Sequence, residues 1–301
     1  AALARGEPLI YSGRLSVDHL LGMEPLFANI YADARAQGLP AETVISEYAP
    51  GQYELTLNYR TDVLTAADDL IRLKRIVRNQ ARRHGVTACF MAKPIADYAG
   101  SGMHFHVSLR DSAGTNVFAE TVEGQWNPPI RHALGGMIAT MGESMLVFAP
   151  HANSWRRFTA QSYAPVSPSW GVNNRSVALR IPAGPLKARR IEHRPAGVDA
   201  NPYLVAATVL AALRHGLENQ IDPGDETTGN GYADQASGDV PEDVIPRDWR
   251  SAIRAAQGSD FLKLALGEDM HRTFCAIKQA EYLRVARTIP DVDYALYLHE
   301  V

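Results

Sequence analysis

Helical and strand-like stretches alternate along this chain, and the alternation restricts it to a mixed α and β architecture, which we classify as α+β. The apolar periodicity predicts helices near residues 17–37, 65–85, 130–148, 202–219 and 269–287. Short strand signals occupy Val44–Tyr48, Tyr53–Leu57, Thr87–Met91, His104–Leu109, Val177–Ile181 and Arg190–Arg194. The aperiodic stretch 222–238, rich in Gly and Asp, indicates a surface loop.

The clearest helix begins at Thr65, where Asp68 completes a capping-box-like start, and it ends at Gly85. Its apolar stripe consists of Leu70, Leu73, Ile76 and Val77. The opposite face carries the basic residues Arg72, Lys74, Arg75, Arg78, Arg82 and Arg83. A solvated helix face is the favoured interpretation of these residues, and a phosphate-binding surface is the alternative.

The composition excludes several classes of function. Apolar residues make up 46% of the 301 residues and charged residues 21%, as in ordinary globular proteins, and no apolar run is long enough to span a membrane. We therefore expect a cytoplasmic protein. The net charge of −3 gives no indication of nucleic acid or an anionic membrane as a partner. Cys89 and Cys275 form neither a disulfide framework nor a CxxC pair, and we predict both to be buried packing residues.

Two acidic residues, Glu47 and Glu54, flank the dipeptide Pro50-Gly51. A tight turn centred on that dipeptide would place residue 47 opposite 54. Directly opposed carboxylates lie about 5 Å apart and repel unless a cation sits between them, and Mg²⁺ prefers such oxygen ligands. The alternative is a solvated hairpin, and the register is open because Pro-Gly suits a type II turn better than the primed turns of tight hairpins.

Histidines and arginines gather on the other predicted strands. His104 and His106 are two apart, so both imidazoles project from one strand face. The preceding Gly100-Ser101-Gly102 frees the backbone to approach a ligand closely. Guanidinium groups suited to carboxylate or phosphate are supplied by Arg156, Arg157, Arg175, Arg180, Arg190 and Arg194, with Glu192 between the last two. An anion site and structural ion pairing are equally good explanations.

The common nucleotide-binding loops and nucleophile motifs are absent from the sequence. What remains is a set of carboxylates, histidines and arginines on strands and loops. Such a set suits phosphoryl transfer from a metal–nucleotide complex, in which positioning and charge neutralisation supply most of the catalysis.

Several motifs, in order and with matching spacing, resemble the glutamine synthetase family: SEYAPGQYE, AGSGMHFHVSL, NSWRRF, SWGVNNRSVALRIP, ARRIEHR and ANPYL. The resemblance implies that residues 1–301 form the catalytic domain, a curved and mostly antiparallel sheet flanked by helices. It also implies that the family's N-terminal β-grasp domain and a strand with two further metal-ligating glutamates lie outside this sequence. In the family these parts of neighbouring subunits complete the site within stacked rings, so we expect a homo-oligomer and little activity from this region alone.

The resemblance also implies roles for individual residues. Glu47 and Glu54 would hold one divalent cation, Mg²⁺ or Mn²⁺, and His104 and Glu192 a second that accompanies ATP. Arg157 and Gly100 would contact glutamate, and Arg194 its γ-carboxyl. Phosphate charge would be neutralised by Arg175, Arg180 and Arg190. Residues that would line the nucleotide or metal region are Tyr59, His106, Ser108 and Lys187.

One departure from the family pattern concerns the acceptor. Ammonia-using members carry a glutamate where this chain has Tyr163, and a neutral phenol cannot provide that anionic subsite. The sequence most resembles γ-glutamylputrescine (γ-glutamylpolyamine) synthetases, so we expect ATP-dependent ligation of glutamate to putrescine or another organic amine through γ-glutamyl phosphate. The alternatives are an ammonia-using glutamine synthetase and a non-enzymatic structural relative. Guanidino kinases, which share a related architecture, are less well matched because their nucleophile-binding signatures are not apparent.

Overall fold

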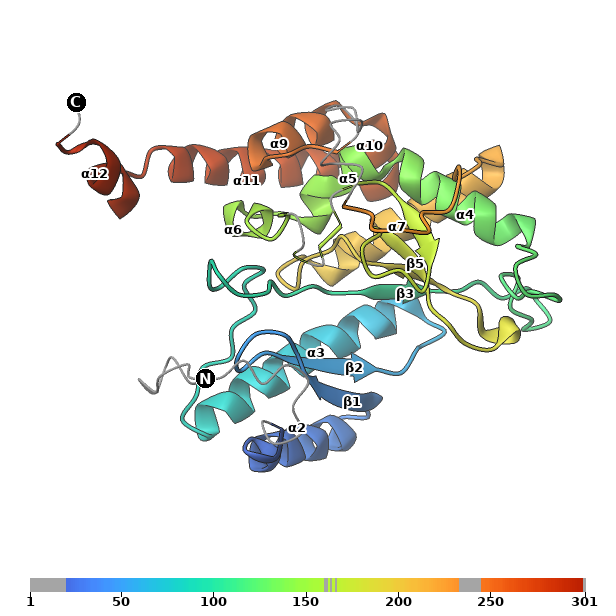
Figure 1. Ribbon diagram of the computed structural model, residues 1–301, viewed down its shortest axis with the longest axis horizontal. Helices are drawn as coiled ribbons and strands as arrows, with labels where there is room; N and C mark the ends of the chain where they lie inside the picture. The colour runs from blue at the N-terminus through green and yellow to red at the C-terminus, as the bar shows by residue number, and fades with distance from the viewer. Residues whose placement is uncertain (1–19, 160–161, 163, 166, 233–244, 300–301) are drawn as a thin grey trace.

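A computed structural model of the chain describes residues 20–159, 162, 164–165, 167–232 and 245–299. Figure 1 shows two parts that meet along an extended central segment. One part contains helix α2 (Glu24–Ala36), the hairpin β1 (Ala41–Ser46) and β2 (Tyr53–Leu57), and helix α3 (Val63–Arg83). Its core includes Phe27, Ile30, Leu73 and Ile76, so α2 and α3 bury their apolar stripes together with the hairpin.

Helix α3 confirms the predicted helix but begins earlier than expected. Asp62 is the N-cap, and its Oδ1 accepts a hydrogen bond of 2.7 Å from the Thr65 amide. The prediction of a solvated basic face is wrong for Lys74, which is buried and donates from Nζ to the Val198 carbonyl at 2.6 Å. The long methylene chain of a lysine allows its head group to cross an apolar layer to such a carbonyl.

The second part is built on a four-stranded sheet in the order β3-β6-β5-β4. The strands are β3 (Phe105–Val107), β4 (Trp170–Val172), β5 (Leu179–Ile181) and β6 (Ile191–His193). β6 runs antiparallel to both β3 and β5, whereas β4 and β5 are parallel. β3, β5 and β6 are shorter than the predicted strands, β4 was not predicted, and the mostly antiparallel pairing is confirmed.

The remaining helices belong to this part of the fold, and the last two extend away from the sheet toward the C-terminus (Figure 1). The helices of this part are α4 (Pro128–Ala139), α5 (Met141–Phe148), α6 (Ala152–Trp155), α7 (Pro202–Asn219), α9 (Trp249–Gly258), α10 (Asp260–Leu266), α11 (Glu268–Ala286) and α12 (Asp291–Tyr297). A 3₁₀ turn, η2 (Leu186–Ala188), precedes β6. The Asn201 side chain caps α7 as predicted. Among the described residues, no helix is both long and apolar enough to cross a bilayer.

Four local predictions were wrong. The helix expected at 130–148 is divided at Thr140, whose Oγ1 donates to the Gly136 carbonyl and competes for helical hydrogen bonds. The helix expected from residue 17 is interrupted by a turn at residues 22–23, and residues 17–19 lie outside the described part. Residues 87–91 form no strand, and the ring of Phe90 instead packs under Arg78, 4.9 Å from its guanidinium. Cys89 is exposed in this irregular segment.

Candidate active site

The β1–β2 hairpin brings Glu47 and Glu54 together, although its register differs from the predicted one. Glu54 lies opposite Ile45, and the Glu47 amide bonds to the Gln52 carbonyl at 2.8 Å. The turn itself closes with a hydrogen bond of 3.0 Å from the Gln52 amide to the Ala49 carbonyl, with φ of +71° at its glycine, as in a type II turn. The shift amounts to two residues, so both glutamates still face the same side of the hairpin.

The two carboxyl groups are close enough to share a hydrogen bond. Burial, Glu47 and Glu192 together raise the pKa of Glu54, against an opposing effect of Arg175. Negative charge is therefore concentrated here, and a hard divalent cation would relieve the repulsion between these oxygen donors. In the described part of the chain, no group of three or more His, Cys, Asp or Glu side chains is already arranged around a metal position.

The carboxylate of Glu192, on β6, is the centre of the second group. Arg194 donates to its Oε1 at 2.6 Å, Arg180 donates to its Oε2 at 2.8 Å, and His104 Nδ1 lies 3.2 Å from Oε1. Burial by itself would raise the pKa of Glu192, but His104, Arg194, His106 and Arg180 outweigh it and lower the pKa to about 2. Glu192 is therefore ionised, and the sheet brings four of the predicted site residues into one cluster.

His104, just before β3, and His106, on β3, both favour the neutral form. Burial and the neighbouring Arg194 lower the pKa of His104 to about 3, although its side chain keeps 30% of its surface exposed. Burial likewise lowers the pKa of His106. Arg190 donates from Nε to His106 Nδ1 at 3.2 Å, so this nitrogen accepts. A neutral imidazole keeps a lone pair that can ligate a metal ion, which fits the predicted role of His104.

Arg157 and Gly100, for which the family resemblance implies a common contact with glutamate, are neighbours. The Arg157 guanidinium is buried and donates to the carbonyls of Pro195, at 2.7 Å, and Arg194, at 3.1 Å. Burial, followed by Arg194, lowers its pKa to about 10, so it keeps its charge near neutral pH. A Cβ on Gly100 would stand 2.9 Å from Arg157 Cγ and 2.8 Å from the Ala92 carbonyl, so only glycine permits this approach.

The other predicted site residues that the structure describes are exposed to solvent. Arg175 is exposed, and its carbonyl accepts from Arg194 at 3.0 Å. Tyr59 is 74% exposed, and its hydroxyl accepts from Arg110 at 3.3 Å rather than from another predicted site residue. Ser108 and Lys187 are also exposed. Tyr163 lies outside the described residues.

Gln52, which was not among the predicted site residues, connects the hairpin to the Gly100 segment. Its Nε2 donates to the Gly100 carbonyl at 2.9 Å and to Ser101 Oγ at 3.1 Å, and its Oε1 accepts from the Ala49 amide at 3.1 Å. Hence one side chain links the carboxylate pair to the backbone beside Arg157. The only signal in the sequence was its place inside the SEYAPGQYE motif.

We expect Gln52→Leu to loosen this connection without unfolding the protein. The loss of three hydrogen bonds that each contribute about 1 kcal/mol should lower the free energy of unfolding by about 1–3 kcal/mol. Amide hydrogen exchange should accelerate in residues 99–103 by about tenfold or more. The same substitution at exposed Gln257 is the control, and equal exchange rates in both variants would contradict the connecting role.

Two acidic residues, Asp199 and Glu120, anchor segments next to predicted site arginines. Asp199 Oδ2 accepts from Ser154 Oγ at 2.7 Å and lies 3.2 Å from His151 Nδ1, which fixes α6 two residues before Arg157. Arg189 donates from Nε to Glu120 Oε1 at 2.6 Å in a buried ion pair beside the predicted nucleotide segment. Isolated acidic residues gave no periodic signal from which these contacts could be predicted.

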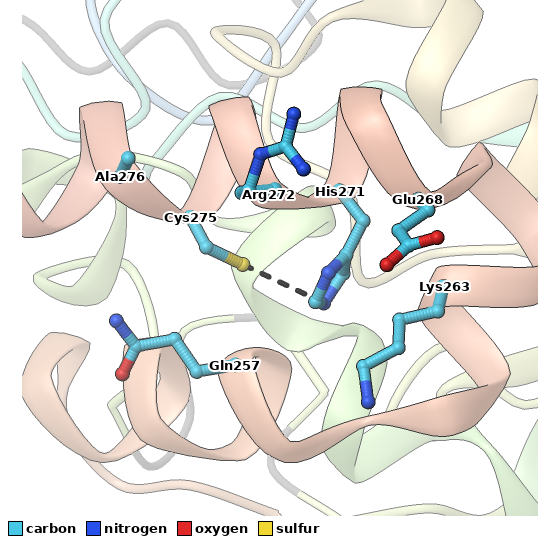
Figure 2. A pocket seen from close by; sticks show the side chains of 7 residues that line it. All are labelled: Gln257, Lys263, Glu268, His271, Arg272, Cys275 and Ala276. Carbon is cyan, nitrogen blue, oxygen red and sulfur yellow. Dashed lines mark hydrogen bonds between the residues drawn. The ribbon is translucent and has the colours of Figure 1, made fainter.

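A separate hollow of about 370 Å³ lies among α9, α10 and α11 (Figure 2). His271 and Cys275 face each other there from successive turns of α11, with 3.7 Å between Nε2 and Sγ. Burial raises the pKa of the Cys275 thiol, and this cysteine is buried as predicted. None of the predicted site residues lines the hollow, so it is separate from the cluster on the sheet.

Comparisons with known proteins match this arrangement to one family. The family described as "Glutamine synthetase, catalytic domain" matches residues 4–297. The chain is 40% identical over 278 residues to "Gamma-glutamylputrescine synthetase PuuA" of Escherichia coli (strain K12), with 92% of this chain and 57% of that protein covered. It is 42% identical over 199 residues to "Glutamate--isopropylamine ligase" of Pseudomonas sp, with 66% and 43% covered.

A solved structure, "GmaS/ADP complex-Conformation 1", superimposes with a TM-score of 0.87 at 30% identity. The match covers 97% of this chain and 68% of that one. The chain thus spans about half the length of the curated relatives that it matches.

Proposed function

The chain belongs to the glutamine synthetase family, and we propose that it forms the catalytic domain of a ligase that joins the γ-carboxyl of glutamate to an organic amine at the expense of ATP. The observation that carries the proposal is the cluster around Glu192, in which one ionised carboxylate meets Arg180, Arg194 and the neutral His104. The carboxylate pair of Glu47 and Glu54 contributes to the same electrostatic environment.

The donor set fits two divalent cations, Mg²⁺ or Mn²⁺. Glu47 and Glu54 offer oxygen ligands for one, and Glu192 with neutral His104 offers ligands for the other. Bound cations would neutralise charge on the carboxylates and on the phosphate oxygens of ATP. We propose further that Tyr59, His106, Ser108 and Lys187 border the nucleotide.

The arginines supply the remaining positive charge. Arg157 beside Gly100 would receive the α-carboxylate end of glutamate, and Arg194 would orient its γ-carboxyl. Arg175, Arg180 and Arg190 would stabilise charge on the phosphoryl group as it passes from ATP to the γ-carboxyl oxygen. The resulting γ-glutamyl phosphate is then attacked at its carbonyl carbon by the amine nitrogen, and phosphate leaves.

The acceptor is the more specific part of the proposal. Tyr163 stands where ammonia-using members have a glutamate, and two relatives are named for putrescine and isopropylamine. A phenol offers no negative charge to hold ammonium, whereas an alkylamine gains affinity from burial of its methylene groups. We therefore propose an alkylamine or polyamine as the acceptor, small molecules as the only substrates, and a homo-oligomeric assembly.

We expect the full-length protein to release phosphate from ATP in the presence of glutamate, Mg²⁺ and putrescine or another alkylamine, with kcat/KM at least about tenfold above that for ammonia. A tenfold preference requires only about 1.4 kcal/mol, less than the burial of two methylene groups provides. Phosphate release with each amine separately is the measurement. Equal turnover with ammonia would favour an ordinary glutamine synthetase.

The non-enzymatic alternative makes a different prediction. A structural relative has no need for ionised Glu192 beside a neutral histidine, and it would not bind ATP in a metal-dependent manner. Calorimetric titration of the full-length protein with ATP, with and without Mg²⁺, is the measurement. It distinguishes a structural relative, which should not bind ATP, from a ligase whose acceptor amine is not among those tested.

A further inference from the structure

Helices α2 and α3 enclose a hollow of about 570 Å³ in the first part of the fold, where Figure 1 shows the two helices side by side. Most of its wall is polar and comes from α3. The lining residues are Asp33, Gln37, Arg72, Arg75, Ile76, Arg78, Asn79 and Arg82. None of them belongs to the site on the sheet, and the proposed ligase chemistry makes no use of them.

The hollow has an excess of positive charge. Four arginines line it against one carboxylate, that of Asp33, whose Oδ2 already accepts from Gln80 Nε2 at 2.5 Å. Among the described residues, no acidic group lies within 4.0 Å of the guanidinium of Arg75, Arg78 or Arg82. Arg72 approaches Asp68 and Asp69 only at 3.7 Å and is half exposed. Because the whole chain carries a net charge of −3, this excess is a local feature.

The spacing of these arginines concentrates the charge on one helix face. Arg75, Arg78 and Arg82 are three and four residues apart, so they lie on adjacent turns, where like charges destabilise a helix. Arg78 is further held by the Phe90 ring, 4.9 Å from its guanidinium. A multivalent anion would relieve the repulsion, and the distance of about 10 Å along the axis between Arg75 and Arg82 requires an anion with more than one charged group.

We propose that this hollow binds an oligophosphate, a chain of two or three phosphoryl groups that is either free or part of a nucleotide. Guanidinium groups pair with phosphate oxygens in a bidentate manner, and successive phosphoryl groups can reach successive arginines. The amides of Asn79 and Gln37 add possible donors on the two walls. This site is independent of the proposed ligase activity.

Isothermal titration of the full chain with tripolyphosphate, in EDTA and at low salt, tests the proposal. The test variant is Arg75→Gln/Arg82→Gln. The matched control removes two exposed arginines from other helices, Arg254→Gln/Arg284→Gln, with the same change in net charge. We expect tripolyphosphate to bind the wild type and the control equally and the test variant at least about tenfold more weakly, because two charge-assisted contacts are lost.

Thermal unfolding controls for a structural role. The Tm of Arg75→Gln/Arg82→Gln should equal or exceed that of the wild type, since like charges are removed from α3. Equal affinity for tripolyphosphate and ATP would indicate recognition of the phosphate chain alone, and tighter binding of ATP would indicate a nucleotide. The proposal is overturned by absence of binding to the wild type, by equal weakening in both double variants, or by binding that Arg175→Gln abolishes and Arg75→Gln/Arg82→Gln leaves unchanged.

Discussion

Gly216→Ala should destabilise this protein by about 3 kcal/mol or more, because α7 crosses α4 at a point where no side chain fits. A Cβ at Gly216 would lie 2.0 Å from the His132 carbonyl oxygen and 2.8 Å from the Cα of Gly136. These are backbone atoms of α4, which cannot rotate aside, so the two helices would have to separate. Separation would open the main core, and overpacking of this kind costs about 1–3 kcal/mol even where side chains can adjust.

Gly258→Ala is the matched control because it makes the same chemical change at the end of α9 in open space. There the added methyl group meets nothing, and the higher helix propensity of alanine should stabilise the protein by up to about 1 kcal/mol. Thermal or urea unfolding, followed by circular dichroism, should therefore move in opposite directions for the two variants. A Tm for Gly216→Ala within 1–2 °C of the wild type, a margin of about 0.5 kcal/mol, would refute the close crossing.

The success of sequence reasoning here depended on how local each signal was. Helix α7 was predicted with its cap because the apolar stripe and the start signal lie in one short segment, whereas for α3 the stripe predicted the helix and its start lies two residues earlier than expected. The register of the hairpin was open from the sequence because it depends on how Pro50-Gly51 closes the turn. The structure has a turn of type II geometry, which leaves extra residues on the first strand and places Glu54 opposite Ile45 instead of Glu47. The two-residue shift preserves the face, so Glu47 and Glu54 still lie close together although they are not directly opposite each other.

Tertiary contacts explain the remaining differences. Lys74 belongs to a run of basic residues that is typical of a solvated helix face, but its ammonium group is buried because it donates to the Val198 carbonyl on another segment. Gln52 is an ordinary polar residue until the fold brings Gly100 to it, 48 positions away. The family resemblance selected the charged residues of the site, whereas the neutral side chain that connects two of its segments is defined by the tertiary structure.

Glu192→Ala should have the largest effect on the proposed activity and a large effect on stability. The substitution leaves Arg194 and Arg180, whose side chains are 5% and 16% exposed, without their shared carboxylate. Removing one partner of a buried ion pair costs about 3–5 kcal/mol. We also expect ATP- and Mg²⁺-dependent phosphate release by the full-length protein to fall about 100-fold or more, because both the proposed cation ligand and the orientation of two arginines are lost.

Glu218→Ala provides the comparison, since Glu218 accepts from Arg214 at a similar distance, 2.7 Å, on an exposed helix face. Exposed pairs contribute at most about 1 kcal/mol, so unfolding and phosphate release should both stay near the wild-type values. If Glu192→Ala were as mild as Glu218→Ala in urea unfolding, the buried cluster would not have the energetic role assigned to it.

Glu192→Gln separates the structural role of this residue from its chemical one. The amide keeps the volume of the side chain, and its oxygen can still accept from one arginine, so part of the lost stability should return. A neutral amide cannot balance two guanidinium groups or replace a carboxylate beside a divalent cation, so phosphate release should stay as low as in Glu192→Ala. Recovery of turnover together with stability would mean that Glu192 serves only to hold Arg180 and Arg194 in place.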